Sequence, residues 1–240
     1  MDLVHGFGWV FTPSNWWGAG GVLNRLWEHL QYAALAMVVS IAIGISLGLL
    51  VGHTRRGMFL STNAAGLIRA IPTLGVLILV YKLRPLTAWP VLIALVILAV
   101  PPILTNTAVG ISTVESDVRD AAEGMGMTGW QVLWRAEVPM ALPLILAGIR
   151  SAATQLIATA TVAAYVGLGG LGRYIIDGYA FRDYPMVYGG AVAVALLALV
   201  VEGLLAFAQR HVVSPGIRST GVTRRAQSYK VPGAADLEPA

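Results

Sequence analysis

The sequence has no cysteine and only a small share of charged residues. Without cysteine it can form neither disulfide bonds nor thiolate sites. Charged side chains make up 12% of its 240 residues, whereas soluble domains carry roughly 25%. Hydrophobic residues make up 57%, and the mean hydropathy is +0.72. This composition predicts a membrane protein rather than a soluble domain.

Motifs of catalysis and nucleotide binding are missing as well. No stretch matches the phosphate-binding pattern G-x-x-x-x-G-K-S/T, so we do not expect the chain to hydrolyse ATP itself. The stretch GLGGLG at 167–172 meets the dinucleotide pattern G-x-G-x-x-G, but it follows a membrane-length apolar run instead of a short strand. We interpret it as a glycine turn for close backbone packing. The four histidines lie at the ends of the apolar runs or outside them, and they form no catalytic constellation. They are His5, His29, His53 and His211. We therefore expect neither an enzyme nor a bound cofactor or metal.

Five apolar runs are long enough to cross a bilayer as helices, at about 1.5 Å per residue through a core of roughly 30 Å. They cover residues 30–52, 60–81, 88–111, 139–166 and 186–209. The sequence therefore predicts an all-α membrane protein with five transmembrane helices. The first run also carries a stripe of small residues at four-residue steps, which predicts the close approach of another helix: Ser40, Gly44, Gly48 and Gly52.

The basic residues and the tryptophans predict an orientation. If the polar segment 112–138 is cytoplasmic, it shares its side with 53–59 and with the residues after 209, and these segments carry nine basic residues against five on the other side. Cytoplasmic loops are enriched in Lys and Arg, so we expect the N-terminus outside and the C-terminus in the cytoplasm. Residues 1–29 hold four tryptophans and predict an interfacial segment on the outer face. Residues 213–240 are polar, without periodicity, and predict a disordered cytoplasmic tail.

The most polar long stretch, SDVRDAAEGMGMTGWQVLWRAEVP at 116–139, separates the third and fourth apolar runs. Its first half predicts a helix whose charged residues, Arg119 among them, face away from the apolar stripe. The side chains of that stripe are small, which favours docking into a protein groove over lying on lipid. A plain solvated loop is the alternative. The members of the stripe recur at helical spacing: Val114, Val118, Ala121, Ala122 and Met125.

Local signals predict where the two short helices of this stretch begin and end. Ser112 with Glu115, and Thr128 with Gln131, have the spacing of capping boxes at two helix starts. Gly124 and Gly126 are expected to separate the helices, and Pro139 to end the second one before the next span.

This loop resembles the EAA loop of bacterial ABC-importer permeases, whose pattern is E-A-A-x3-G-x9-I-x-L-P. The chain departs from the pattern with Asp for Glu at 120, Ala for Ile at 136 and Val for Leu at 138. The resemblance implies the type I permease fold, in which this loop forms the coupling helix that sits in a cleft of a separate ATPase subunit. The coupling residues that it implies here are Asp120, Ala121, Ala122, Gly126 and Pro139.

Further stretches resemble the osmoprotectant branch of these permeases, which import glycine betaine, carnitine or choline. They are RAIPTLG (69–75), PPILTNTAVGI (101–111), LPLILAGIRSA (142–152) and VGLGGLG (166–172), within about 40–210. The resemblance implies a permease domain at 30–212 with its coupling loop at 112–139, in the bacterial inner membrane. It also implies three partners: an ATPase subunit, an extracytoplasmic binding protein and a second permease subunit. The runner-up functions are a methionine-type or other amino-acid permease and, less favoured, a stand-alone carrier.

Polar groups inside the predicted spans are candidates for function or for pairing. We expect Glu202 to pair with Arg150 or Arg69 and so to lock the helix bundle, because unpaired buried charges are costly. A second set of polar residues in the spans are candidates for lining a substrate path. Their alternative role is hydrogen bonding between helices. They are Asn63, Thr73, Asn106, Thr154, Gln155 and Thr161.

Overall fold

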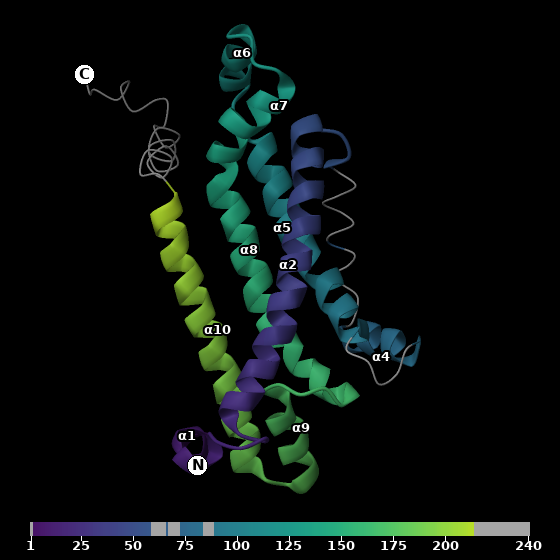
Figure 1. Ribbon diagram of the computed structural model, residues 1–240, viewed down its shortest axis with the longest axis vertical. Helices are drawn as coiled ribbons and strands as arrows, with labels where there is room; N and C mark the ends of the chain where they lie inside the picture. Colours follow the sequence, from purple (N-terminus) through teal and green to yellow (C-terminus); the bar gives the residue numbers. More distant parts are fainter. Residues whose placement is uncertain (1, 59–65, 67–72, 84–88, 214–240) are drawn as a thin grey trace, which may run out of the picture.

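The computed structural model describes residues 2–58, 66, 73–83 and 89–213, and within them all regular structure is helical. Four long helices run side by side, and shorter elements gather at the two ends of this bundle (Figure 1). In chain order the elements are α1 (Asp2–Phe11), the 3₁₀ turn η1 (Pro13–Asn15), α2 (Val22–Thr54), α4 (Thr73–Leu83), α5 (Trp89–Ser112), α6 (Ser116–Gly124), α7 (Gly129–Val132), the π-helical turn η2 (Leu133–Glu137), α8 (Val138–Ala160), the 3₁₀ turn η3 (Thr161–Val166), α9 (Gly172–Phe181) and α10 (Tyr184–Val212).

Four described helices are long and apolar enough to cross a membrane, namely Val22–Thr54, Trp89–Ser112, Gly129–Val166 and Tyr184–Val212. They confirm the first, third, fourth and fifth predicted spans. The predicted second span at 60–81 lies largely outside the described residues, and its last part coincides with α4.

The small-residue stripe of α2 forms its contact with α5, as predicted. Ser40, Gly44, Gly48 and Gly52 are all buried. A Cβ atom at Gly48 would lie 2.5 Å from Cβ of Thr107, and one at Gly52 would lie 2.7 Å from Cβ of Ile111. The two helices therefore pack at a distance that only small residues allow.

The third helix of this core is α8, which packs on α5 and α2, while α10 packs on α8. The backbones of α5 and α8 also approach closely, because a Cβ atom at Gly148 would lie 2.7 Å from Cβ of Asn106. The α10 helix is the least covered of the four long helices. Its apolar side chains Leu199, Leu204 and Phe207 are exposed in the single chain, which leaves this surface for lipid or another subunit.

The bundle end formed by α1, α9 and the first turns of α2 and α10 is a small packed unit, here called the α1–α9 end. Trp9 meets Tyr174 edge-on with ring centroids 4.9 Å apart. The Tyr174 hydroxyl donates a hydrogen bond to the carbonyl oxygen of Gly20 at 2.7 Å. The tryptophans of this part of the chain do not share one environment: Trp17 is exposed, but Trp9 packs into the unit.

The glycine turn at 167–172 closes this end against α2. Gly167 and Gly170 have φ values of +81° and +92°, a conformation that favours glycine. The backbone N–H of Gly170 donates to the Glu28 carboxylate at 2.8 Å. The start of α2, which the apolar pattern placed before the span, therefore binds the glycine turn. The glycine turn serves packing, as expected.

Candidate functional site

The polar loop between α5 and α8 forms the opposite end of the molecule, here called the α6–α7 end (Figure 1). The α6 helix ends in a turn where Gly126 has a φ of +82° and donates its N–H to the carbonyl of Glu123 at 2.8 Å. The α7 helix begins with the expected capping pair, because Gln131 Oε1 accepts from the backbone N–H of Thr128 at 2.8 Å.

Two local predictions for this loop are wrong. Ser112 is the last residue of α5 and donates to the carbonyl of Val109, so it does not cap the next helix. Pro139 does not end a helix either, because residues Gly129–Val166 form one continuous helical rod. A π turn at Leu133–Glu137 ends two residues before Pro139. Proline clashes with the carbonyl four residues earlier in an α-helix, and the wider π turn provides the room that avoids this clash.

The outer surface of the loop is apolar and exposed. Met125 is 72% exposed and Trp130 is 69% exposed, and the ring of Trp130 meets that of Trp134 at a centroid distance of 5.5 Å. The expected stripe does not share one face: Ala121 and Met125 are exposed, whereas Ala122 is only 3% exposed. The exposed residues of the loop form one surface, which we call the coupling surface after the role that the sequence resemblance implies for this loop: Asp120, Ala121, Met125, Trp130 and Trp134.

A buried carboxylate lies beneath this surface. Glu137, the last residue of the π turn, has an exposure of 0%. His53 at the end of α2 donates from Nδ1 to its Oε2 at 2.6 Å, and Arg119 of α6 forms an ion pair with its Oε1 at 3.0 Å. Arg119, which the helical spacing placed away from the apolar stripe, therefore has a buried partner that the spacing did not indicate.

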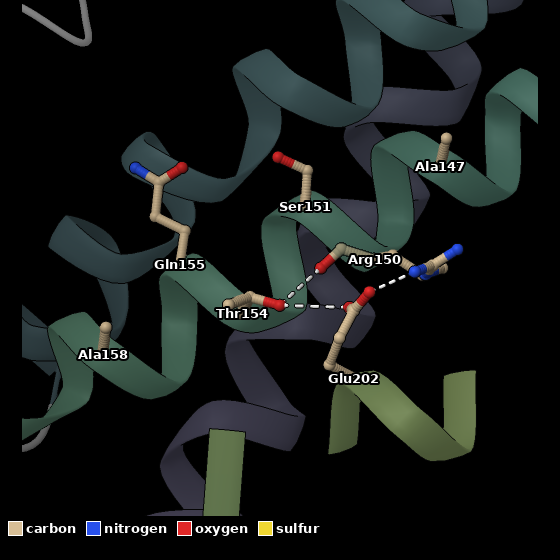
Figure 2. A pocket seen from close by; sticks show the side chains of 7 residues that line it. All are labelled: Ala147, Arg150, Ser151, Thr154, Gln155, Ala158 and Glu202. Atoms are coloured by element: carbon tan, nitrogen blue, oxygen red, sulfur yellow. Dashed lines mark hydrogen bonds and ion pairs between the residues drawn. The ribbon is translucent and has the colours of Figure 1, made fainter. Parts of the chain in front are cut away.

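The other polar constellation lies midway along α8 and α10 and lines a hollow of about 700 Å³ (Figure 2). Arg150 of α8 forms an ion pair with Glu202 of α10 and donates to Gln209 at 2.6 Å. The Thr154 hydroxyl reaches the same Glu202 carboxylate at 3.3 Å. The hollow is lined by one face of α8 and one residue of α10: Ala147, Arg150, Ser151, Thr154, Gln155, Ala158 and Glu202.

The structure brings together only part of the expected path set. Thr154 and Gln155 line the hollow beside the Arg150–Glu202 pair. Asn106 lies at the α5–α8 contact and donates to Pro102 of its own helix, and Thr161 donates to Ala158. Asn63 and Arg69 lie outside the described residues, as does the side chain of Thr73.

The described residues contain no group of three His, Asp or Glu side chains arranged to hold a metal ion. The hollow contains both charge signs, while the loop surface is apolar with an acidic residue at its edge. This arrangement suits passage of a small polar molecule at one place and protein contact at the other.

Comparison with known families matches residues 7–219 to the family described as binding-protein-dependent transport system inner membrane component. The chain belongs to this family. Membership of this family and the long apolar helices agree that the chain is a multi-pass protein of the inner membrane.

Individual members of the family resemble the chain over most of its length. The glycine betaine/carnitine/choline transport system permease protein OpuCB of Bacillus subtilis is 34% identical over 83% of this chain and 92% of its own length. The osmoprotectant import permease protein OsmW of Salmonella typhimurium is 35% identical over 91% of this chain and 100% of its own length. The choline transport system permease protein OpuBB of Bacillus subtilis is 32% identical over 83% and 92%.

Among solved structures, the inward-facing MetNI methionine ABC transporter matches 80% of this inner-membrane component with a TM-score of 0.70 and 19% identity. The match covers 96% of that transporter chain. At this identity the likeness establishes the fold, which is that of an ABC-importer permease.

Sequence reasoning missed His53 and Glu137 as a pair, because 84 residues separate them along the chain. It also missed that Ala147, Ser151 and Ala158 share the lining face of α8 with Thr154. The signal for that face was present, since these small residues recur at the three- and four-residue steps of one helix face.

Proposed function

We propose that this chain is the permease subunit of an ATP-driven importer of quaternary-ammonium osmoprotectants, the class that contains glycine betaine, carnitine and choline. The observation that carries the proposal is the identity of 32–35% to permeases named for these solutes over most of the chain. The polar hollow supports it, because a zwitterion such as betaine needs surroundings of both charge signs.

Uptake by the complete transporter tests the substrate class. The chain is reconstituted in proteoliposomes with its ATPase and binding protein, and radiolabelled betaine, carnitine, choline, proline and methionine are offered one at a time. We expect ATP-dependent uptake of one or more of the first three. Uptake of methionine alone would establish the runner-up function, and uptake without ATP would establish a stand-alone carrier.

We further propose that the coupling surface docks into the ATPase subunit. Apolar side chains as exposed as Met125 and Trp130 are typical of protein interfaces. The neighbours Ala121 and Ala122 offer a matched test, because the first is exposed and the second is buried. Ala121→Trp should leave the chain folded in the membrane but abolish ATPase co-purification and uptake. Ala122→Trp should instead lower the amount of folded chain, and normal uptake by Ala121→Trp would refute the docking.

The proposed docking requires the α6–α7 end to lie in the cytoplasm and the α1–α9 end to lie outside. The absence of cysteine from the chain makes single-cysteine labelling direct. A membrane-impermeant maleimide added to intact cells should label Tyr179→Cys, which is exposed on α9, and should not label Met125→Cys until the membrane is opened and the ATPase subunit is removed. The reverse pattern would contradict the orientation.

The hollow between α8 and α10 is our candidate for a part of the substrate path, with a second permease subunit completing it. Its charges neutralise each other, so a cationic or zwitterionic solute meets no net repulsion. Ser151→Cys lies on its lining, and bound substrate should slow the labelling of this variant. Labelling of Leu199→Cys on the exposed face of α10 should not change, and equal behaviour of the two positions would remove the hollow from the path.

A further inference from the structure

The buried carboxylate of Glu137 connects three elements that the chain order keeps apart. It lies at the end of the π turn, and its two basic partners come from the end of α2 and from α6. The chain itself joins α6 only to α5 and α7. Among the described elements α6 packs on α7 and η2, whereas α2 packs on α5 and α8.

A carboxylate at this place needs a reason beyond filling space. Removing an ion pair from water is costly, and an apolar side chain of the same size would pack as well at lower cost. What an ion pair adds is a directed link, because the two oxygens hold partners on different elements at fixed distances. Glu137 has an exposure of 0%, and each of its oxygens faces a different basic side chain.

We propose that Glu137 is a positioning residue that makes α2 move together with the coupling loop. The proposal rests on the proposed ATP-driven function. The backbone passes a displacement of α6 and α7 to α5 and α8, the two helices that the loop joins. Through Glu137 the same displacement reaches His53 at the end of α2, so that α2 follows as part of one rigid body.

The test uses the full transporter with ATPase and binding protein in lipid nanodiscs and proteoliposomes. Spin labels at Leu50→Cys on α2 and Asp117→Cys on α6, two exposed positions, report the distance between the elements, with labelled chain diluted into unlabelled chain. In the wild-type chain we expect the same narrow distance distribution without nucleotide and in the ATP-trapped state. Glu137→Gln should broaden it and make it depend on nucleotide.

Transport gives the second readout. We expect Glu137→Gln to keep ATP hydrolysis but to lower the solute moved per ATP by about tenfold, within the range usual for coupling between sites. His53→Gln and Arg119→Gln remove one partner each and should act in the same direction. Glu123→Gln, on the exposed side of the same helix α6, is the matched control and should leave both readouts unchanged.

A folding defect is separated from lost coupling by a double variant. Glu137→Gln combined with Arg119→Met removes both the carboxylate and the guanidinium that would otherwise lose its partner. The amount of folded chain should therefore recover, while the distribution of label distances should stay broad. A narrow distance and normal transport per ATP in any folded Glu137 variant would overturn the proposal, as would a wild-type distance that changes with nucleotide. If the wild-type complex neither hydrolyses ATP nor transports, the proposed function fails, and the label distances still decide whether Glu137 links α2 to α6.

Discussion

The two ends of the molecule are each held by a glutamate, but the two glutamates bind in different ways. At the α1–α9 end Glu28 accepts from the backbone N–H of Gly170 at 2.8 Å and pairs with Arg25 of its own helix. At the α6–α7 end the Glu137 carboxylate pairs, within the described part of the chain, with the side chains of Arg119 and His53. The first contact therefore depends on how closely the backbone can approach, and the second depends on charge.

This difference indicates what each end tolerates. A contact between a carboxylate and a glycine turn fixes the backbone and fails when a side chain is added to the turn. A contact between charged side chains does not depend on a bare backbone, but it fails when a charge is removed. We therefore expect the α1–α9 end to be sensitive to added side chains and the α6–α7 end to be sensitive to loss of charge.

The largest effect should follow from adding one methyl group to the glycine turn. A Cβ atom at Gly172 would overlap the backbone oxygen of Thr161, which has no side-chain freedom to escape. We expect Gly172→Ala to destabilise the chain by about 3 kcal/mol, measured by thermal unfolding in detergent. The amount of folded protein in the membrane should fall as well. Gly203→Ala, where no atom lies within 4 Å of the added Cβ, is the control and should be neutral.

Neutralising the two glutamates should separate the two ends. Glu137→Gln leaves the half-buried Arg119 without a full negative charge beside it, and we expect a loss of about 2 kcal/mol. Glu28→Gln keeps an oxygen that can accept from Gly170 and loses only a partly exposed ion pair with Arg25, so its loss should be about 0.5 kcal/mol. Equal melting temperatures of the two variants would contradict this distinction.

The smallest effect concerns alkaline pH and the α1–α9 end alone. Burial raises the pKa of Tyr174 to about 12, whereas an unfolded tyrosine titrates near 10. The hydroxyl that donates to Gly20 therefore contributes its stabilisation fully below about pH 10, and this contribution is lost as the pH rises to about 12. Tyr174→Phe should cost about 1 kcal/mol at neutral pH and should remove this alkaline loss. Fluorescence of Trp9, which touches Tyr174, measures it, and an unchanged alkaline profile in the variant would refute the assignment.

Much of the fold could be predicted because the membrane imposes a simple rule on sequence. Apolar length located four spans, and the spacing of Gly44, Gly48 and Gly52 located the α2–α5 contact. The same rule could not find the beginning of α2 at Val22, because the polar residues of its first turns bind the glycine turn instead of lipid. It also missed α9, which is too short and too polar to register as a span.

The same rule explains which residues of the candidate sites could be predicted and which could not. Arg150 and Glu202 were recognisable because charges are rare in apolar runs, and the structure places them in contact. Glu137 was hidden among the other charges of the polar loop, and its partner His53 lies far away in sequence. Ala122 was expected on the docking face, but the position of α6 turns it inward and leaves Ala121 outside.

The π turn before Pro139 has a mechanical consequence. Because it lets the helix pass the proline unbroken, Gly129–Val166 is a single piece of 38 residues, which at about 1.5 Å per residue is roughly 55 Å long. One tip carries Trp130, and the other runs directly into the glycines gripped by Glu28. No loop interrupts the backbone between Trp130 and this glycine turn, so a displacement at the first tip is passed to the second along helical chain alone.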